Sequence, residues 1–337
     1  MGDILAPLAM IDIHSHFFPP MSRATAEGFG ESWPWLRNDG GGSGTIMCGD
    51  DGYRPVDQTL WDGHARLAAL DGFAIDRQII CATPILFGYL VDSEQAHAVA
   101  VAVNDMALDH CAADRSRLHS LCQVPLQDLR LACDELERSM RAGHVGVQIG
   151  NHVGERDLDD GQLIEFLQHC ALVDAPVLVH PWDMFGRDRM NRYMLQWLVA
   201  MPAETQLSIL YLILSGAFER LPRTLKLCFA HGGGSFAYLL GRVDNAWRER
   251  DIVHRDCPRP PSSYCDRFAT DSAVFSEEAL TLLVNTMGEE RVLFGTDFPF
   301  PLGEKHPGRL ITEHAGLAAA TRTRLLSQNA VNFFDLT

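Results

Sequence analysis

The stretch Ile11-Asp12-Ile13-His14-Ser15-His16-Phe17 decides how the rest of the chain is interpreted. Its apolar residues predict a short buried strand, and the two histidines stand at the carboxyl end of that strand. Alternate residues of a strand point to the same face, so the two imidazoles share one face. Two neutral imidazoles suit a divalent metal ion, whereas two charged ones would repel each other. The pair alone is weak evidence, and it becomes strong only if later strands end in further ligands.

Seven more apolar runs predict seven more strands. Most are continuous, as is typical of parallel strands buried on both faces, and amphipathic helical patterns lie between them. This alternation predicts an α/β fold, a (β/α)₈ TIM barrel, and 337 residues suit it with room for insertions. A doubly wound open sheet is the alternative, but no G-x-G-x-x-G follows any strand. The predicted strands are 9–16, 77–83, 118–125, 145–150, 176–180, 225–231, 268–272 and 291–297, and the clearest helices are 93–113, 129–142, 161–173, 206–220, 235–250 and 276–287.

We expect residues 1–337 to form a single barrel domain with one insertion, 17–57, over the mouth of the barrel. The insertion contains the run Gly40-Gly41-Gly42-Ser43-Gly44 and has little helical pattern. The glycine run is interpreted as a flexible loop. Short strands are expected near 45–48 and 53–56.

The composition excludes several classes of partner. The formal net charge of −16 argues against nucleic acid or an anionic membrane surface. Nine scattered cysteines without paired spacing indicate reduced thiols in a cytoplasmic protein. No signal peptide is recognised. The most apolar segment, 207–218, is shorter than the roughly 20 residues of a membrane span and is expected to be a buried helix.

The carboxyl ends of the predicted strands carry chemistry-bearing side chains. His14 and His16 end the first strand, His180 the fifth, His231 the sixth, and Asp297 the eighth. In barrel enzymes the active site lies at this face. Three histidines and one carboxylate are a plausible set of ligands for zinc or a similar ion. From the residues alone, His231 is either a ligand or an unligated base.

This order of residues resembles the amidohydrolase superfamily. Motifs that carry the resemblance are Ile13-His14-Ser15-His16-Phe17-Phe18-Pro19, Tyr53-Arg54-Pro55-Val56, His180-Pro181-Trp182-Asp183-Met184 and His231-Gly232-Gly233-Gly234-Ser235-Phe236. Binuclear members carry a bridging lysine or glutamate at the end of the fourth strand. The stretch 145–151 has neither residue, so the resemblance implies a mononuclear site.

The resemblance also implies an activity and a metal. Metal-dependent decarboxylases of the superfamily are the most similar, with one Zn²⁺ per subunit on His14, His16, His180 and Asp297 and with no organic cofactor. Zinc can lower the pKa of a water molecule that it binds to about 7. His231 would be the catalytic acid or base that moves a proton. One departure is Phe294-Gly295-Thr296-Asp297-Phe298, where Ser-Asp-Tyr is common, but the carboxylate is kept.

The implied substrate is a small dianionic semialdehyde, for which guanidinium groups are expected. By resemblance, Arg54 binds the substrate, and Arg242 reaches the neighbouring site of a homodimer. Both are therefore candidate catalytic and substrate-binding residues. From the sequence alone, Arg242 would be a solvated residue on a helix face. Trp182 and Trp197 are candidate walls of the substrate site, or core residues.

Two other functions stay open at this point. The first is another mononuclear-metal decarboxylase or hydrolase, acting on an aromatic acid or a cyclic amide. The metal set does not distinguish these, whereas Arg54 and the insertion do. The second is a non-catalytic metal-binding scaffold, although a structural zinc site is usually closed and rich in cysteine.

Overall fold

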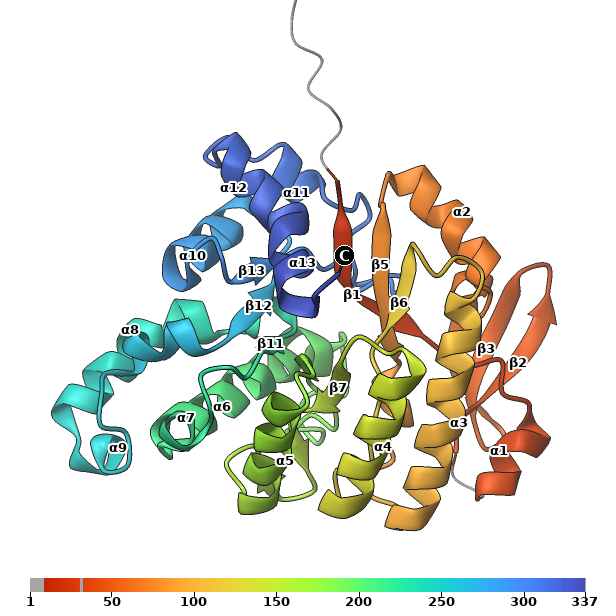
Figure 1. Ribbon diagram of the computed structural model, residues 1–337, viewed down its shortest axis with the longest axis horizontal. Coiled ribbons are helices and arrows are strands. Elements are labelled where there is room, and N and C mark those ends of the chain that lie inside the picture. Colours follow the sequence, from red (N-terminus) through yellow and green to blue (C-terminus); the bar gives the residue numbers. More distant parts are fainter. Residues whose placement is uncertain (1–8, 31–32, 337) are drawn as a thin grey trace, which may run out of the picture.

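A computed structural model of the chain describes residues 9–30 and 33–336. Eight parallel strands close into a barrel in the order of the chain (Figure 1). Hydrogen-bonded pairing divides the strands into a group of three and a group of five. The N–H of Cys122 donates to the carbonyl of Gly146, and the N–H of Ile13 donates to the carbonyl of Phe294, and these two bonds join the groups to each other on both sides. The (β/α)₈ fold is thereby confirmed. Its strands are β1 (Ile11–Phe17), β5 (Arg77–Ala82), β6 (Leu118–Ser120), β7 (Val147–Gly150), β10 (Val177–His180), β11 (Leu227–Phe229), β12 (Ala269–Asp271) and β13 (Val292–Leu293).

All eight strands lie where the apolar runs predicted them, but most are shorter. The last strand shows why. β13 ends at Leu293 because the chain turns beyond it, and the N–H groups of Thr296 and Asp297 donate to the carbonyl of His14. Asp297 has a φ of 60°, in the left-handed region, so strand geometry cannot continue through it.

Apolar side chains fill the lower part of the barrel and the layer between strands and helices. One buried cluster takes a side chain from almost every strand, and α13 (Asn329–Phe334) adds Ala330 and Phe334 to it. A second, larger cluster contains the alternate strand residues and the inner faces of the surrounding helices. This two-sided burial explains why the strands are continuous apolar runs.

The helices follow the predicted pattern closely. α3 (Ser93–Cys111), α4 (Leu129–Ala142), α5 (Gly161–Leu172), α8 (Phe236–Glu249) and α10 (Glu277–Met287) agree with prediction to within one or two residues. α2 (Gly63–Phe73) was not predicted from the sequence, because a charged residue, Arg66, is fully buried on its inner face. The remaining short elements are β8 (His152–Val153), β9 (Arg156–Asp157), α9 (Asp251–His254), α11 (Arg309–Thr312) and α12 (Ala319–Thr323).

The predicted helix 206–220 is wrong at both ends. The helical run begins with a π-helical turn at Gln196–Ala200 and continues as α6 (Met201–Leu214), and α7 (Ala217–Arg220) is separate. The break is at Gly216, whose φ is 71° and whose absent Cβ would lie 2.4 Å from the carbonyl oxygen of Asp256.

The complete run Gln196–Leu214 is long and apolar enough to cross a membrane by length and composition. A buried core helix meets the same criterion. Ile209, Leu212 and Ile213 have no exposed surface and belong to the larger core cluster.

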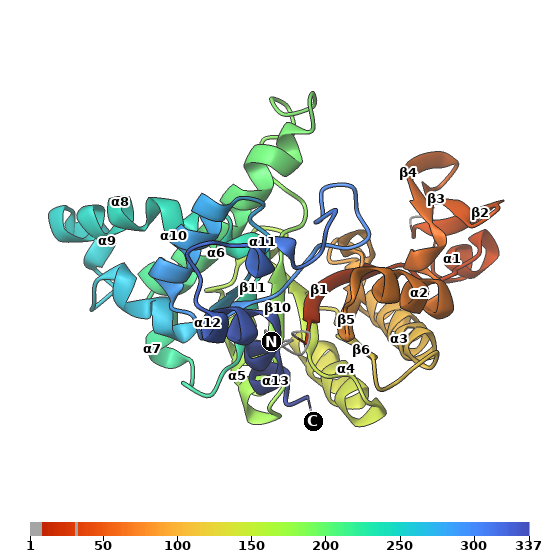
Figure 2. The same ribbon diagram turned by 90° about the horizontal axis from the view of Figure 1, so that it is seen from above.

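The insertion after β1 is more regular than expected. It contains α1 (Arg23–Phe29) and a three-stranded antiparallel sheet of β2 (Trp35–Gly40), β3 (Ser43–Cys48) and β4 (Asp51–Asp57). The strands expected at 45–48 and 53–56 are β3 and β4, whereas α1 and β2 were missed. The glycine run is the tight turn between β2 and β3, not a flexible loop. This small sheet stands to one side of the barrel, beyond α2 and α3 (Figure 2).

Glu304 is a half-buried carboxylate in the loop after β13, and its Oε2 accepts a hydrogen bond from the N–H of Gly308 at 2.9 Å. Burial raises its pKa from 4.5 to about 7. Between these two values the folded protein holds a proton that the unfolded chain has released. The free energy of unfolding therefore decreases as the pH rises through this window.

We predict that Glu304→Gln removes this decrease. Above pH 7 the variant should be more stable than the native protein by on the order of 1–3 kcal/mol, and near pH 5 the two should be similar. The glutamine oxygen can still accept the bond from Gly308. Urea unfolding of the metal-free proteins at pH 5 and pH 8 measures the difference, with Glu155→Gln, at an exposed turn, as the matched control. The same pH dependence in Glu304→Gln and the native protein would contradict it.

Candidate active site

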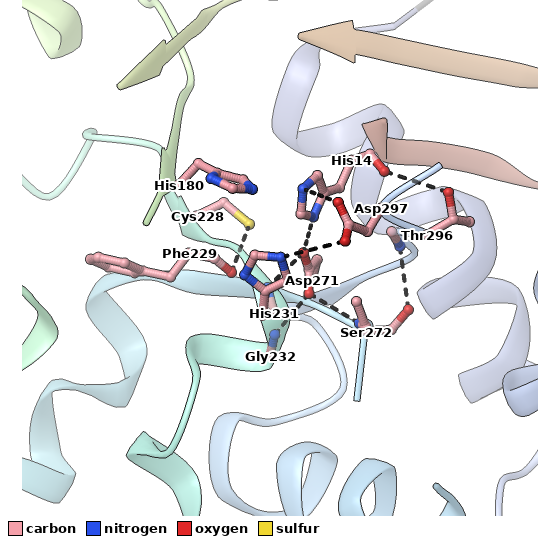
Figure 3. A network of polar contacts seen from close by, with 12 residues as sticks. His14, His180, Cys228, Phe229, His231, Gly232, Asp271, Ser272, Thr296 and Asp297 are labelled. Atoms are coloured by element: carbon pink, nitrogen blue, oxygen red, sulfur yellow. Dashed lines mark hydrogen bonds and ion pairs between the residues drawn. The ribbon is translucent and has the colours of Figure 1, made fainter. Parts of the chain in front are cut away.

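Five side chains from four strand ends meet at the carboxyl-terminal face of the barrel. His14 and His16 come from β1, His180 from β10, His231 from the turn after β11, and Asp297 from the turn after β13. The centroid of the His14 imidazole lies 5.1–5.2 Å from the ring centroids of the other three histidines. Figure 3 shows His14, His180, His231 and Asp297 pointing toward one centre. The structure thus brings together all five residues that the strand-end pattern predicted.

The distances between these groups fit a single metal ion. Atoms bound to a tetrahedral ion at about 2.0–2.1 Å lie about 3.3 Å apart. The Nε2 of His14 lies 3.3 Å from the Nε2 of His16 and 3.7 Å from Oδ1 of Asp297, and the Nε2 of His16 lies 3.0 Å from the same oxygen. The Nε2 of His180 is buried with no hydrogen-bond partner among the described residues. This donor set is therefore a metal-binding site.

The outer nitrogens of two histidines are already held. The Nδ1–H of His14 donates to Oδ2 of Asp271 at 2.6 Å, and the Nδ1–H of His180 donates to the carbonyl of Pro181 at 2.8 Å. With Nδ1 protonated, each ring presents an unprotonated Nε2 toward the centre. Such bonds to the outer nitrogen are usual for metal-binding histidines.

Burial and charge set the protonation of the cluster. Burial lowers the pKa of His16 to about 4, and it also lowers the pKa of His180 and His231. Burial alone would raise the pKa of Asp297, but its bond with His16 and the charges of the neighbouring histidines lower it to about 2. At His14, burial alone would lower the pKa, but the hydrogen bond with Asp271 and the negative charge of Asp271 outweigh burial and raise the pKa. An ionised Asp297 thus lies beside the neutral imidazoles of His16, His180 and His231.

Geometry alone allows two sets of four ligands. The donor atoms of His14, His180, His231 and Asp297 all lie within 4.8 Å of one another, whereas the predicted set has His16 in place of His231. We favour the predicted set on contacts. The Nε2 of His16 lies 3.0 Å from Oδ1 of Asp297, whereas the Nε2 of His231 lies 3.9 Å from Oδ2, farther than two atoms bound to one tetrahedral ion would lie. Neither ring nitrogen of His231 has a hydrogen-bond partner among the described residues. An imidazole without fixed partners suits proton transfer.

A cavity of about 680 Å³ opens directly above the metal-binding site. Arg54, from β4 of the insertion, lines it, and its guanidinium lies 4.6 Å from the ring centroid of Phe300 and 6.0 Å from that of Trp197. Trp182 lines the cavity too, with its indole N–H donating to the carbonyl of His152 at 2.7 Å. The structure therefore places Arg54, Trp182 and Trp197 together around the cavity that contains the metal-binding residues.

Arg242 is not brought to this cavity within one chain. It lies exposed on α8, outside the described residues that line the cavity. Its predicted role requires a second copy of the chain and stays a prediction.

Three residues around the site, Arg187, Phe300 and Asp271, were not predicted from the sequence. Arg187 and Phe300 line the cavity but lie in irregular segments where no periodic pattern marks them. Arg187 also pairs with Asp183. Asp271 was missed although a signal existed, since it ends β12 at the same face of the barrel as the predicted ligands.

We predict that His16→Ala loses the metal, whereas His231→Ala keeps it at close to one ion per chain and loses most activity. The reason is that His16 is hydrogen-bonded to Asp297, whereas neither ring nitrogen of His231 has a hydrogen-bond partner among the described residues. Metal stoichiometry measured by atomic emission after desalting decides between them. Full metal content in His16→Ala together with metal loss in His231→Ala would assign the ligand role to His231 instead.

An amidohydrolase family model matches residues 11–336 of the chain. The 2-amino-3-carboxymuconate-6-semialdehyde decarboxylase of Dictyostelium discoideum is 38% identical over 97% of this chain and 91% of that protein. The enzyme of the same name from Caenorhabditis elegans is 31% identical over 97% of this chain and 94% of its own length.

Solved structures show the same fold. A dihydroxybenzoic acid decarboxylase from Polaromonas sp., with bound manganese and an inhibitor, is similar with a TM-score of 0.77 over 97% of both chains, at 23% identity. The resemblance inferred from the motifs is confirmed by these matches. The chain belongs to the amidohydrolase family, is similar over nearly its whole length to 2-amino-3-carboxymuconate-6-semialdehyde decarboxylases, and is a metal-dependent carboxy-lyase.

Proposed function

We propose that the protein is a zinc-dependent enzyme that converts 2-amino-3-carboxymuconate 6-semialdehyde into 2-aminomuconate 6-semialdehyde and carbon dioxide without oxidation. The observation that carries this proposal is the cavity above the metal-binding histidines, in which the Arg54 guanidinium lies against aromatic rings. Relatives at 38% and 31% identity have this activity in their names. No organic cofactor enters the proposal, because the conjugated aldehyde can itself accept electron density.

Different residues of the cavity bind different parts of the substrate. The guanidinium of Arg54 binds one carboxylate by paired hydrogen bonds. Trp182 and Trp197 provide apolar faces for the flat conjugated chain. An acidic chain with a net charge of −16 needs such a local cation to attract a dianion.

The chemical step needs one proton at carbon. A proton first adds to C3 of the amino-enamine, so that C3 becomes tetrahedral and C2 becomes an iminium carbon. The bond between C3 and the carboxylate then breaks, carbon dioxide leaves, and the electron pair restores the C2–C3 double bond and the conjugated semialdehyde. His231 is the group that delivers this proton, from the ring nitrogen facing Asp297. When bound at His14, His16, His180 and Asp297, zinc supplies a Lewis acid that makes a bound water acidic at neutral pH.

A direct assay on freshly generated 2-amino-3-carboxymuconate 6-semialdehyde tests the function. We expect zinc-loaded protein to accelerate loss of the substrate chromophore, with one carbon dioxide released per molecule consumed, faster than spontaneous ring closure. A chelator should abolish the rate, and added zinc should restore it. A hydroxybenzoate and a cyclic amide serve as comparison substrates. No acceleration with the semialdehyde, but turnover of a hydroxybenzoate, would assign the protein to the aromatic-acid decarboxylases instead.

We also infer that the protein acts as a homodimer. The segment between β10 and α6 projects from the barrel (Figure 2). This segment and α6 expose large apolar side chains that a second copy would cover, consistent with an interface. They are Phe185, Tyr193, Met194, Leu198, Val199, Leu207 and Tyr211. The same segment carries Trp197 into the cavity, so an interface there would lie beside the site.

In such a dimer, Arg242 would act in the neighbouring subunit. We predict that Arg242→Ala and His231→Ala proteins, each nearly inactive, recover up to about one quarter of native activity when mixed. Statistical exchange makes half of the dimers hybrids, and each hybrid contains one site with both residues intact. Recovery is measured after mass spectrometry has confirmed subunit exchange. No recovery in exchanged dimers would contradict action in trans.

A further inference from the structure

Asp271 is a fully buried residue at the carboxyl end of β12, and its carboxylate accepts four hydrogen bonds. Oδ2 accepts from Nδ1–H of His14 at 2.6 Å and from the backbone N–H of His231 at 2.9 Å. Oδ1 accepts from the N–H groups of Gly232 at 2.8 Å and Ala273 at 3.0 Å. One side chain thus holds two parts of the active site at once, as Figure 3 shows.

The bond to His14 determines which nitrogen of that ring carries the proton. A carboxylate has no hydrogen to give, so Nδ1 of His14 must be the donor. The neutral ring then has its lone pair on Nε2, the atom that lies 3.3 Å from Nε2 of His16 and 3.7 Å from Asp297. That is the form able to bind a metal ion at this position.

The bond to His231 fixes the backbone of the proton-transfer residue. His231 has a φ of 55°, a left-handed conformation that is unfavourable for a residue other than glycine. The carboxylate of Asp271 accepts the N–H groups of both His231 and Gly232 and so stabilises the turn. The turn directs the imidazole of His231 toward Asp297.

The space around Asp271 is shaped for this contact. A Cβ at Gly295 would lie 2.8 Å from the Cβ of Asp271 and 2.9 Å from the Cβ of His14. Any side chain at that position would push the carboxylate and the imidazole away. The absence of a side chain at Gly295 allows the short bond between them.

We propose that Asp271 is a positioning residue that couples metal binding to proton transfer, by fixing the tautomer of His14 and the backbone of His231 through one carboxylate. The proposal rests on the metal-dependent decarboxylase function. It concerns the protein before any substrate binds.

An isosteric change isolates this role. In Asp271→Asn, an amide oxygen at the Oδ1 position still accepts from Gly232 and Ala273, but the NH₂ group then faces the N–H of His231 and Nδ1 of His14. The amide can only donate there, which would move the proton of His14 to Nε2 and block the metal. In the opposite orientation, two backbone N–H groups face the NH₂ group, so neither orientation restores the contacts.

We expect Asp271→Asn to fold and to bind zinc about 10- to 100-fold more weakly than the native protein in a chelator competition. The matched control is Thr270→Val on the same strand, also isosteric and buried, whose hydroxyl has no partner among the described residues. It should bind zinc as the native protein does. At saturating zinc, Asp271→Asn should still show a lower kcat, because His231 has lost its support, with KM changed little.

A second measurement needs no change to Asp271. In the metal-free native protein, ¹⁵N-edited histidine spectra should show a strongly hydrogen-bonded, slowly exchanging proton on Nδ1 of His14, assigned by its loss in His14→Gln. Zinc affinity of folded Asp271→Asn within threefold of native, or a neutral His14 ring in the native protein whose single proton is on Nε2, would overturn the proposal. Both readouts are independent of substrate, so they separate this inference from the choice of substrate.

Discussion

The whole site depends on the closure of the barrel, where the first strand meets the last. Asp12 makes that closure specific. Its fully buried carboxylate accepts bonds from the N–H of His14, from Nε2 of Gln78, and from both the N–H and the hydroxyl of Thr296. These donors lie on β1, on β5 and directly beyond β13. Burial raises the pKa of Asp12 to about 6, although its hydrogen bonds with the Thr296 hydroxyl, Gln78 and the N–H of His14 oppose the rise. Together with the backbone hydrogen bond from Ile13 to Phe294, this contact holds the first and last strands in one relative position.

The interior of the barrel changes character along its axis. The lower part contains apolar side chains such as Ile79, Leu178 and Leu293, which are removed from water and stabilise the fold. The upper part contains ionisable groups whose burial is tolerated only because each anion faces donors, as Asp12 and Asp271 do. The residues that stabilise the fold and the residues that form the active site therefore lie at different levels inside one barrel.

The sequence allowed the fold and the metal-binding residues to be predicted for a simple reason. Parallel strands bring their carboxyl ends to one face whatever the lengths of the intervening helices. His14, His180 and Asp297 could therefore be assigned to one site from the sequence alone. The irregular segments had no such rule. Arg187 reaches the cavity along a path that no periodicity encodes, and α2 was missed because a buried arginine interrupts its apolar face.

The small antiparallel sheet after β1 contributes Tyr53, Arg54 and Pro55 to the cavity lining but no residue to the metal-binding cluster. Its pairing is internal, β2 with β3 and β3 with β4, so its architecture does not depend on the register of the barrel. The metal-binding cluster and one part of the cavity wall thus come from separate segments of the chain. In evolution, exchange of the insertion can redirect the same barrel toward a differently shaped acid, whereas a change at a strand end removes turnover of every acid alike.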